Sequence, residues 1–441
     1  MSTVVSGEPV QTATNRWPIR TWPAVAILAL MTFLMIVPAT VAPRTMYHFV
    51  GLMGAPALAA LLAIGWWMLA SGARQPMRIL VPLVFLVPAI AFMATVYATN
   101  PPAVILFGLP LPLVVWVVWL MATPWMPTVP RQIGLLATIV LAWVGFSLVR
   151  VNGTDADLKP ELRWVWTKTA EDEYLANLPA KSAASVDPVE VKPGDWAEFR
   201  GPNRDNKCPG IQIATDWEKS PPTLVWKQRI GPGWGSFAVV GNRIFTQEQR
   251  GPKEAVVCYA ADTGGQIWEY AVEARFFEGI AGAGPRATPT IVDGKLYATG
   301  ATGHVACLDA ATGTKIWSRE LTADAEAAVP QWGFSSSPLV KHGKAYVCGC
   351  GGAKGKGLVA YDAATGNVAW TAGAATHSYS SPQAELVGGV EQVLLVSDFG
   401  LESFAPDTGK ILWSDNWAIK GLNRVTQPAR IGEGDFVYGT G

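Results

Sequence analysis

Acidic residues are missing from the first third of this 441-residue sequence. No Asp or Glu lies between Glu8 and Asp155, and no Lys precedes Lys159. The only fully charged side chains in that stretch are seven Arg residues. A water-soluble globular domain carries charges of both signs on about a quarter of its residues. The composition therefore excludes such a domain here and indicates a membrane segment.

Five long apolar runs occupy this acid-free region. Each has about the 20 residues that a helix needs to cross the hydrocarbon core of a bilayer. The runs are Trp22–Val41, Phe49–Leu69, Ile79–Thr95, Ala103–Met121 and Gly134–Val149. Asn100, Pro101 and Pro102 predict a tight turn between the third and fourth runs. We expect a helical transmembrane bundle of five spans over residues 21–150, or of four if one Pro-rich run enters the bilayer without crossing it.

The Arg residues predict the orientation of these spans. With residues 1–20 as a cytoplasmic tail, five Arg lie on the inner side and two on the outer side. The inner set is Arg16, Arg20, Arg74, Arg78 and Arg131, and the outer set is Arg44 and Arg150. This excess favours a cytoplasmic N-terminus and places the C-terminal part on the periplasmic, extracytoplasmic side. Proton and ion pathways usually need charged residues inside the spans, so we expect an anchor in the lipid bilayer rather than a transporter.

The remaining sequence has the composition of a water-soluble protein. Residues 151–441 hold 27 basic and 33 acidic side chains, a net charge of −6. This balance argues against a nucleic-acid partner, which selects a basic surface. Residues 151–195 are polar and interrupted by Pro, which predicts an extracytoplasmic linker. Within it, Thr169 and Asp172 have the spacing of a helix start, which predicts a short helix over Thr169–Leu178.

A repeat dominates residues 196–441. Four segments contain Thr-Gly with a Trp four residues after the Gly, and successive Trp residues are 49, 53 and 43 positions apart. These residues are Trp268, Trp317, Trp370 and Trp413. Periods of this length between β-rich runs are typical of propeller blades. We expect an all-β propeller of four-stranded blades.

Two positions of each repeat have a predicted structural role. The Gly before each Trp lies where a hairpin turn needs positive φ, and the Trp ring can fill the wedge between neighbouring blades. Cys258 and Cys307 each lie six residues before their Gly, where the other repeats have Ala360 and Ser403. Because this position accepts only small residues, we expect the two Cys side chains to pack rather than to take part in redox chemistry.

Two copies of the repeat share a nine-residue motif. Asp309–Trp317 reads Asp-Ala-Ala-Thr-Gly-Thr-Lys-Ile-Trp, and Asp362–Trp370 reads Asp-Ala-Ala-Thr-Gly-Asn-Val-Ala-Trp, whereas the other copies have Ala260 and Ala405 in place of the Asp. The motif resembles the blade motif of the PQQ-like (quinoprotein-type) repeat propellers. The segment Asp195–Arg204 resembles a bacterial membrane-anchored subgroup. The resemblance covers residues 195–441 and implies the fold more than an activity, since the family includes both dehydrogenases and a non-enzymatic outer-membrane assembly scaffold.

Four full repeats and part of a fifth can be counted. The full units cover residues 236–273, 286–321, 334–373 and 379–417, and a fifth begins near Asn423. Rings of the resembling family have about eight blades, so the resemblance implies a propeller that is incomplete at the C-terminus of this sequence. Thr223–Lys227 resembles an outermost strand of the kind that closes such rings.

Candidate ligand residues lie where the innermost strands begin, since propellers bind ligands on that face near the central channel. We assign Arg286, Trp332, Ser336, Ser380, Arg424 and Gln427 as candidate cofactor-binding residues, with Trp234 and Ser236 at similar positions. Arg286 and Arg424 could clamp an anion through bidentate hydrogen bonds, and Trp332 or Trp234 could lie flat on a ring. The alternative is structural: the Ser/Thr-Pro pairs satisfy strand ends while the Arg side chains face solvent.

The resemblance to the family's dehydrogenases implies PQQ, which carries three carboxylates, together with Ca²⁺. Asp398 and Glu402 lie near a hairpin, but nothing distinguishes them from solvated turn acids as Ca²⁺ ligands or as a general base. Many alcohol-oxidising members carry two adjacent Cys, whereas the nearest pair here is Cys348-Gly-Cys350. That pair is open to interpretation as a strand end, a redox pair or a soft-metal site. The sequence has no Cys-x-x-Cys-His haem motif, and its four scattered His residues support neither a zinc site nor a Ser-His-Asp triad.

Two functions remain open at this stage, and with them the question of whether the protein is an enzyme. The first is a membrane-anchored extracytoplasmic binding or scaffold module for protein partners or a small anionic ligand. It is favoured because the blades lack recognisable catalytic parts. The second is a membrane-bound PQQ-dependent dehydrogenase that oxidises a sugar or alcohol and reduces membrane quinone. Its support is a resemblance of the five spans and propeller to membrane-bound glucose dehydrogenases.

Overall fold

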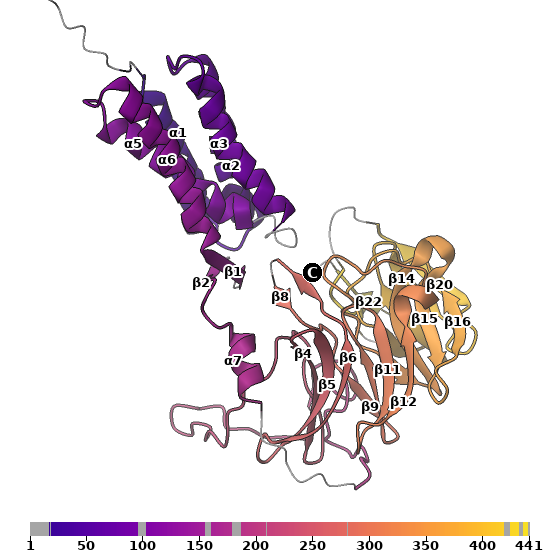
Figure 1. The fold of residues 1–441 in the computed structure, drawn as a ribbon. Coiled ribbons are helices and arrows are strands. Elements are labelled where there is room, and N and C mark those ends of the chain that lie inside the picture. The colour runs from indigo at the N-terminus through magenta and orange to yellow at the C-terminus, as the bar shows by residue number, and fades with distance from the viewer. Residues whose placement is uncertain are drawn as a thin grey trace, which may run out of the picture. The chain divides into compact units, whose positions relative to one another are not determined.

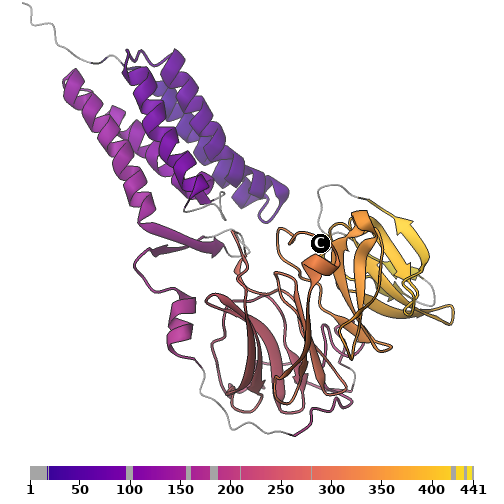
Figure 2. The ribbon, with the colours of Figure 1, turned by 45° about the vertical axis from the view of Figure 1, so that its right-hand side comes forward.

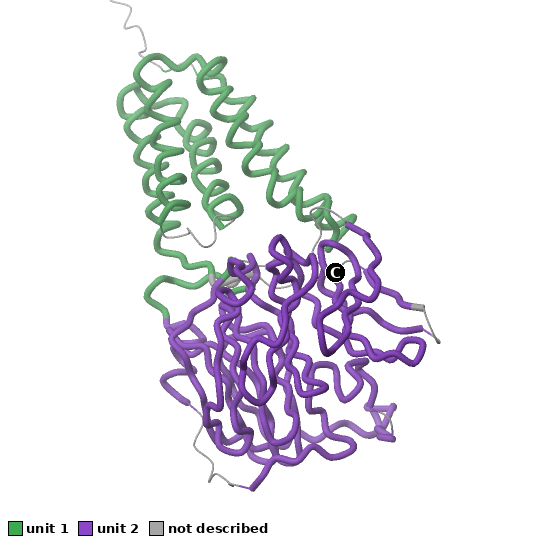
Figure 3. Tube along the Cα trace, turned by 90° about the vertical axis from the view of Figure 1, so that its right-hand side faces the viewer, with its two compact units in different colours: residues 1–167, 278–282 green, residues 168–277, 283–441 purple. Residues whose placement is uncertain are grey.

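The protein divides into two compact units. The computed structural model describes residues 17, 19–95, 103–154, 160–178, 187–208, 210–279, 281–418, 424–431 and 435–439. Unit 1 comprises Met1–Thr167 and Glu278–Gly282, and unit 2 comprises Lys168–Phe277 and Ala283–Gly441 (Figure 3). The boundary falls inside the predicted linker. Residues 1–16 of the predicted tail, the predicted turn at Asn100–Pro102 and the start of the fifth repeat at Asn423 lie outside the described residues.

Among the described residues, unit 1 contains five helices that are long and apolar enough to cross a membrane (Figures 1 and 2). They are α1 (Trp22–Val41), α2 (Met46–Leu69), α3 (Met77–Ala94), a fourth in which η1 (Val104–Gly108) leads into α5 (Pro110–Ala122), and α6 (Thr128–Ser147). The five predicted apolar helices are confirmed. The last begins at Thr128 rather than Gly134. Pro127 occupies its N-cap position, and its first turns include the polar residues Thr128, Arg131 and Gln132, which the apolar run left out.

The earlier start of α6 corrects the assignment of Arg131 to a loop. Arg131 lies in the first turn of α6 and is buried. Its guanidinium donates hydrogen bonds to the carbonyl oxygens of Trp17 at 2.9 Å and Leu120 at 2.7 Å. A buried charge is tolerated when it is hydrogen-bonded in this way. The orientation argument therefore depends on the other six Arg residues. After α6, β1 (Val149–Thr154) pairs antiparallel with β2 (Pro160–Trp164).

Unit 2 contains four successive four-stranded antiparallel sheets, which we call blades A to D (Figures 1 and 2). Blade A is β3 (Ala238–Val240), β4 (Arg243–Arg250), β5 (Lys253–Ala260) and β6 (Gln266–Glu273). Blade B is β9 (Thr290–Val292), β10 (Lys295–Thr299), β11 (His304–Asp309) and β12 (Lys315–Glu320), followed by α8 (Leu321–Asp324). Blade C is β13 (Leu339–Lys341), β14 (Lys344–Gly351), β15 (Lys356–Asp362) and β16 (Val368–Ala372), with η2 (Gly352–Lys354) between β14 and β15. Blade D is β17 (Gln383–Val387), β18 (Val390–Val396), β19 (Gly400–Phe404) and β20 (Ile411–Asn416).

The strand order within each blade follows the sequence, as predicted for propeller blades. The first strands of neighbouring blades, β3, β9, β13 and β17, lie beside one another and are the inner strands. Two short pairs complete the sheets: β7 (Phe277–Glu278) with β8 (Gly282–Ala283), and β21 (Ala429–Ile431) with β22 (Asp435–Val437). The predicted four-stranded repeats are thus confirmed in a propeller-like arrangement.

A Trp ring joins each blade to the next. Gly366 has a φ of +76°, and a Cβ added there would lie 2.6 Å from the ring of Trp317, which belongs to the preceding blade. The indole of Trp317 also donates a hydrogen bond to the carbonyl of Ala363 at 3.0 Å. The same arrangement joins Trp268 to Gly313 and Trp370 to Gly409. Both predicted roles, positive φ for the Gly and wedge filling for the Trp, are confirmed.

Trp226 takes the corresponding place before blade A. A Cβ on Gly264 would lie 2.8 Å from its ring, and its indole donates to Ala261 at 2.9 Å. The outermost strand predicted over Thr223–Lys227 is wrong, however. These residues have no strand partner among the described residues, and a strand needs a neighbour to receive its backbone hydrogen bonds. Of the features expected for a closing strand at Thr223–Lys227, only the contact of Trp226 with the turn of blade A is formed.

Cys258 and Cys307 pack as predicted. Each is fully buried and faces the Trp of its own blade across the ladder, Trp268 and Trp317 respectively. Ala360 and Ser403 occupy the same position opposite Trp370 and Trp413. All five Cys residues are free thiols.

The predicted helix near Thr169 forms and is anchored to blade A. Helix α7 (Ala170–Ala176) begins with a capping box, in which Thr169 Oγ1 accepts from the Asp172 amide at 2.9 Å and Asp172 accepts from the Thr169 amide at 2.8 Å. Glu171 on this helix accepts from the Gly251 amide at 2.8 Å and forms a two-pronged ion pair with Arg275. The helix is therefore part of the fold of unit 2.

Candidate binding face and axial segment

Hydroxyl groups link the blades at the face where the inner strands begin. The Ser236 amide donates to Thr288 Oγ1, the Thr288 amide to Ser337 Oγ, and the Ser337 amide to Ser381 Oγ, each at 2.9 Å. Thr288, Ser337 and Ser381 each precede a Pro, which offers no amide of its own. These hydroxyls hold the blades together, which favours the structural interpretation of the Ser/Thr-Pro pairs.

The segment Asp195–Arg204 runs along the inner strands of several blades. Trp196 exchanges two backbone hydrogen bonds with Val239 of β3, and the Ile291 amide of β9 donates to Ala197 at 2.8 Å. Further along, Gln383 of β17 donates to the Asn203 carbonyl at 3.3 Å. A stretch that precedes the blades in sequence thus occupies the inner side of blades A, B and D, and we call it the axial segment.

Arg204 fixes the end of the axial segment to blade C. Its buried guanidinium donates to the carbonyls of Ser337 at 3.3 Å and Pro338 at 3.1 Å, and it forms an ion pair with Glu198 at 2.9 Å. Burial lowers the pKa of Arg204 and raises that of Glu198, and the ion pair opposes both shifts. This contact restrains the end of the axial segment against blade C.

A cavity of about 590 Å³ lies between the axial segment and the inner strands of blades C and D. Its charged lining residues include Arg200, Lys207, Lys341 and Arg430, together with Glu198 and Glu385. Arg200 donates to Gln427 Oε1 at 3.2 Å, so the predicted site residue Gln427 is bound to the axial segment. The excess of basic groups suits a small anionic ligand.

The two Arg residues predicted to clamp an anion are held in separate surroundings. The Arg286 guanidinium lies 5.2 Å from the ring of Phe276. Arg424 is fully buried: its Nε donates to the Ser397 carbonyl at 3.1 Å, and its guanidinium lies 4.8 Å from the ring of Trp417. The structural alternative, in which these Arg side chains face solvent, is therefore wrong for Arg424.

The other predicted residues lie in different surroundings. Trp332 stacks on Tyr379 with ring centroids 6.1 Å apart, while Trp234 is 62 % exposed. Ser336 and Ser380 are buried, and the Ser380 amide donates to Ser378 Oγ at 3.0 Å. The Tyr379 amide donates to the Arg424 carbonyl at 2.8 Å, which brings Trp332 and Arg424 into one neighbourhood. The predicted set as a whole remains a prediction.

Asp398 and Glu402 both bind backbone amides; Glu402 is buried in β19, whereas Asp398 is half-buried in the turn between β18 and β19. Asp398 accepts from the amides of Thr376 and His377 at 2.9 Å each. The buried Glu402 accepts from the Ala374 amide at 3.0 Å, and burial raises its pKa. Throughout the part of the chain that the structure describes, no three His, Cys, Asp or Glu side chains gather as metal ligands. The PQQ–Ca²⁺ site implied by the resemblance to the dehydrogenases therefore stays a prediction.

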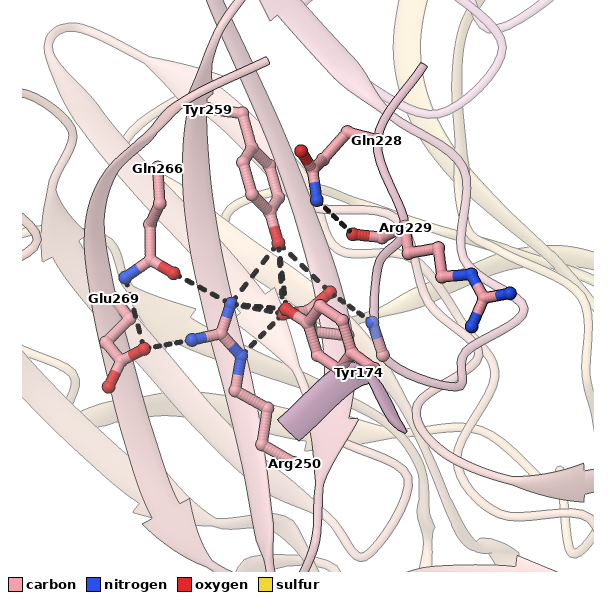
Figure 4. A network of polar contacts seen from close by, with 9 residues as sticks. Tyr174, Gln228, Arg229, Arg250, Tyr259, Gln266 and Glu269 are labelled. Atoms are coloured by element: carbon pink, nitrogen blue, oxygen red, sulfur yellow. Dashed lines mark hydrogen bonds and ion pairs between the residues drawn. The ribbon is translucent and has the colours of Figure 1, made fainter. Parts of the chain in front are cut away.

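A buried polar network in blade A was missed by the sequence interpretation (Figure 4). Arg250 Nε donates to Glu248 Oε1 at 2.6 Å, and Arg250 also contacts Tyr174, Tyr259, Gln266 and Glu269. Burial raises the pKa of the Tyr174 and Tyr259 hydroxyls, and the negative charge of Glu248 is the second cause. Both hydroxyls stay protonated and donate hydrogen bonds to Glu248. The sequence signal that could have revealed this network is the unbroken run of polar residues Thr246–Arg250, which lies in the buried strand β4.

A second missed residue, Glu254, is a buried acid at the beginning of β5. Its Oε1 accepts from the Ala301 amide of blade B at 3.1 Å. Burial raises its pKa to about 7, against the opposing effects of the Ala301 and Thr302 amides, the Thr302 side chain and Arg286. No motif marks it, since its burial depends on the approach of the next blade.

Glu254 should make stability fall as the pH rises. Between the unfolded pKa of about 4.3 and the folded value of about 7, only the folded state keeps the proton. The contribution of Glu254 to the free energy of unfolding is therefore fully present below the unfolded pKa and is lost as the pH rises through the folded pKa. We expect Glu254→Gln to remove this slope and to raise stability at pH 8 by on the order of 2 kcal/mol. Urea unfolding at several pH values would show it, with the exposed Glu273→Gln as control; an unchanged slope in Glu254→Gln would refute the assignment.

The repeats also match a known protein family. A family model described as outer membrane protein assembly factor BamB matches residues 220–287 and 279–438. The repeat region belongs to the PQQ-like repeat propeller family. This agrees with the resemblance seen in the Thr-Gly-x-x-x-Trp motifs. No curated protein sequence matches the chain.

Solved structures of PQQ-like proteins resemble the chain weakly. Quinohemoprotein alcohol dehydrogenase ADHIIG from Pseudomonas putida HK5 is 18% identical with a TM-score of 0.38, over 54% of this chain and 42% of its own. BamB from Moraxella catarrhalis is 19% identical with a TM-score of 0.30, over 46% and 68% respectively. The alcohol dehydrogenase from Comamonas testosteroni is 16% identical with a TM-score of 0.40, over 59% and 46%. The chain thus spans less than half the length of either dehydrogenase.

Proposed function

We propose that the protein is a membrane-anchored binding or scaffold module whose PQQ-like blades lie outside the cytoplasm. The observation that carries the proposal is the axial segment. It lies along the inner strands, where Arg204 binds the Pro338 carbonyl and Arg200 binds Gln427, one of the candidate cofactor-binding residues. The polar side chains of this face are used to hold the protein together, and exposed side chains remain for contact with partners.

Apolar side chains at the ends of the blades supply such contacts. Trp234 and Phe237 precede inner strand β3, Trp417 follows outer strand β20, and Val425 precedes β21; all four are exposed. In an antiparallel blade of four strands, the first strand begins and the last strand ends at the same face. Exposed apolar groups concentrated on one face are typical of protein-binding surfaces. The description of the matched family, an outer membrane assembly factor, supports a protein partner.

Photo-crosslinking in native membranes tests this function. A photoreactive residue at Trp234 should yield a discrete adduct with another protein, whereas one at Val368 on outer strand β16 should not. Addition of PQQ and Ca²⁺ to the purified protein should give no quinone absorbance and no dye reduction with sugars or alcohols. A quinone band with substrate-dependent dye reduction would support the dehydrogenase instead and overturn the proposal.

The location of the blades can be tested with the cysteines of the protein itself. Cys208 is exposed, whereas the other four Cys residues are buried. We expect a membrane-impermeant maleimide to label Cys208 in right-side-out vesicles and not in inside-out vesicles. Cys208→Ser should abolish the labelling. Labelling confined to inside-out vesicles would reverse the orientation predicted from the Arg residues.

A further inference from the structure

Two buried thiols lie in contact at the end of β14. The sulfur atoms of Cys348 and Cys350 are 3.5 Å apart, and both residues are at least nine-tenths buried. Residues two apart on a regular strand have Cα atoms about 6.6 Å apart, close to the upper limit for a disulfide. Here a register shift between Cys348 and Gly351 interrupts the strand, and Cys350 has a φ of +55°. The irregularity brings the two sulfur atoms together.

Close packing holds this irregular backbone in place. A Cβ on Gly349 would lie 2.7 Å from the Lys356 carbonyl oxygen and 2.8 Å from Ala325 Cβ. A Cβ on Gly351 would lie 2.0 Å from the Ala325 carbonyl oxygen. Only glycine fits on either side of Cys350, and a non-glycine residue with positive φ between them is uncommon. Strained backbone that its surroundings hold in place is a recurring feature of functional sites.

The surroundings of the two thiols shift their pKa values in opposite directions. The hydrogen bond between them lowers the pKa of Cys350 and raises that of Cys348. Cys350 Sγ also lies 3.7 Å from the Ser378 carbonyl oxygen. The Asp398 carboxylate raises the pKa of both thiols and so does not distinguish them. Cys350 is also the more exposed of the two, at 9 % against 1 %. These features favour Cys350 as the attacking thiol, since the thiolate is the nucleophile in disulfide exchange.

We propose that Cys348 and Cys350 form a reversible intramolecular disulfide, with a disulfide-bearing oxidant as co-reactant. The Cys350 thiolate attacks one sulfur of the oxidant, and the other sulfur leaves as a thiolate that takes up a proton. The Cys348 thiol then gives up its proton and attacks Cys350 Sγ, which expels the second half of the oxidant as a thiol. Two protein thiols are oxidised to one disulfide, and the oxidant disulfide is reduced to two thiols.

Glutathione disulfide is a suitable probe for the purified full-length protein. Lys344 and Lys354 flank the pair, so trypsin releases both Cys residues in the single peptide Ala345–Lys354. After equilibration in glutathione buffers and alkylation, we expect this peptide to lose two hydrogens and to take up no alkyl group. Half-oxidation should need about tenfold less glutathione disulfide in the folded protein than in urea, where the sulfur atoms are not held together. The measurement does not depend on the proposed function, since only the source of oxidant in the cell depends on an extracytoplasmic location.

Matched variants make the test specific. The variant with Cys258→Ala and Cys307→Ala should behave like the parent, because Ala360 already fills the same position in blade C. Cys348→Ser should leave Cys350 as a mixed disulfide with glutathione. Two alkyl groups on the peptide at every glutathione ratio would overturn the proposal. Protection by bound copper without the loss of two hydrogens would overturn it in favour of a soft-metal site. The comparison of folded and urea-treated parent protein decides the matter even where a variant does not fold.

Discussion

Gly366→Ala should lower the unfolding free energy of unit 2 by about 2–4 kcal/mol. The added methyl group incurs the cost of positive φ, about 1 kcal/mol, and meets the ring of Trp317 at 2.6 Å, which adds about 1–3 kcal/mol of overpacking. Pulse proteolysis of the full-length protein in urea would report the change, since cleavage follows the population of unfolded unit 2.

Gly343 provides the matched control for this substitution. Its φ is +69° in the hairpin between β13 and β14, but nothing lies within 4 Å of an added Cβ. Gly343→Ala should therefore show only the conformational cost, about 1 kcal/mol. Equal losses for the two variants would mean that the contact between Trp317 and Gly366 contributes nothing to the joining of blades B and C.

Arg250→Met should destabilise unit 2 by about 3–5 kcal/mol, because it leaves the Glu248 carboxylate buried without a counter-charge. Glu248 is fully buried and would keep hydrogen bonds from the Gly231 amide at 2.8 Å, Tyr174 at 2.7 Å and Tyr259 at 3.1 Å. These bonds come from neutral donors and do not neutralise the charge. Since Tyr174 belongs to α7, we also expect faster proteolysis at that helix in the variant.

A second substitution distinguishes loss of charge balance from loss of packing. Glu248→Gln combined with Arg250→Met removes both charges and should recover a large part of the lost stability. Lys253→Ala, which breaks the exposed ion pair with Glu273 at 3.4 Å, should cost no more than about 0.5 kcal/mol. If the double variant were as unstable as Arg250→Met alone, unpaired charge would not be the cause.

The fold could be predicted from the sequence because its determinants are local. The spacing of Gly366 and Trp370 specifies a hairpin turn and its following strand, and the repeat then specifies the blade. The apolar runs of unit 1 and the capping residues Thr169 and Asp172 act in the same local way. These elements lie within about three residues of their predicted bounds, except that α6 begins at Thr128, six residues before the predicted start at Gly134.

The candidate site was less predictable because its contacts join distant parts of the chain. Arg204 binds Pro338, and Arg200 binds Gln427, more than 130 and 220 positions away. No spacing rule connects such residues, so the axial segment was not foreseen, and Arg424 was expected to meet solvent or ligand. The burial of Glu254 depends in the same way on a neighbouring blade.

The contacts between Trp and Gly give the row of blades a direction. The indoles of blades A, B and C each contact the turn of the blade that follows in sequence, and blades B, C and D each receive such a contact from the blade before. During synthesis the donor ring is therefore already present when its acceptor turn leaves the ribosome, and Trp226 is there before the first sheet exists. The blades can therefore fold one after another during translation, because the Trp that covers the Gly turn of each blade has already been synthesised.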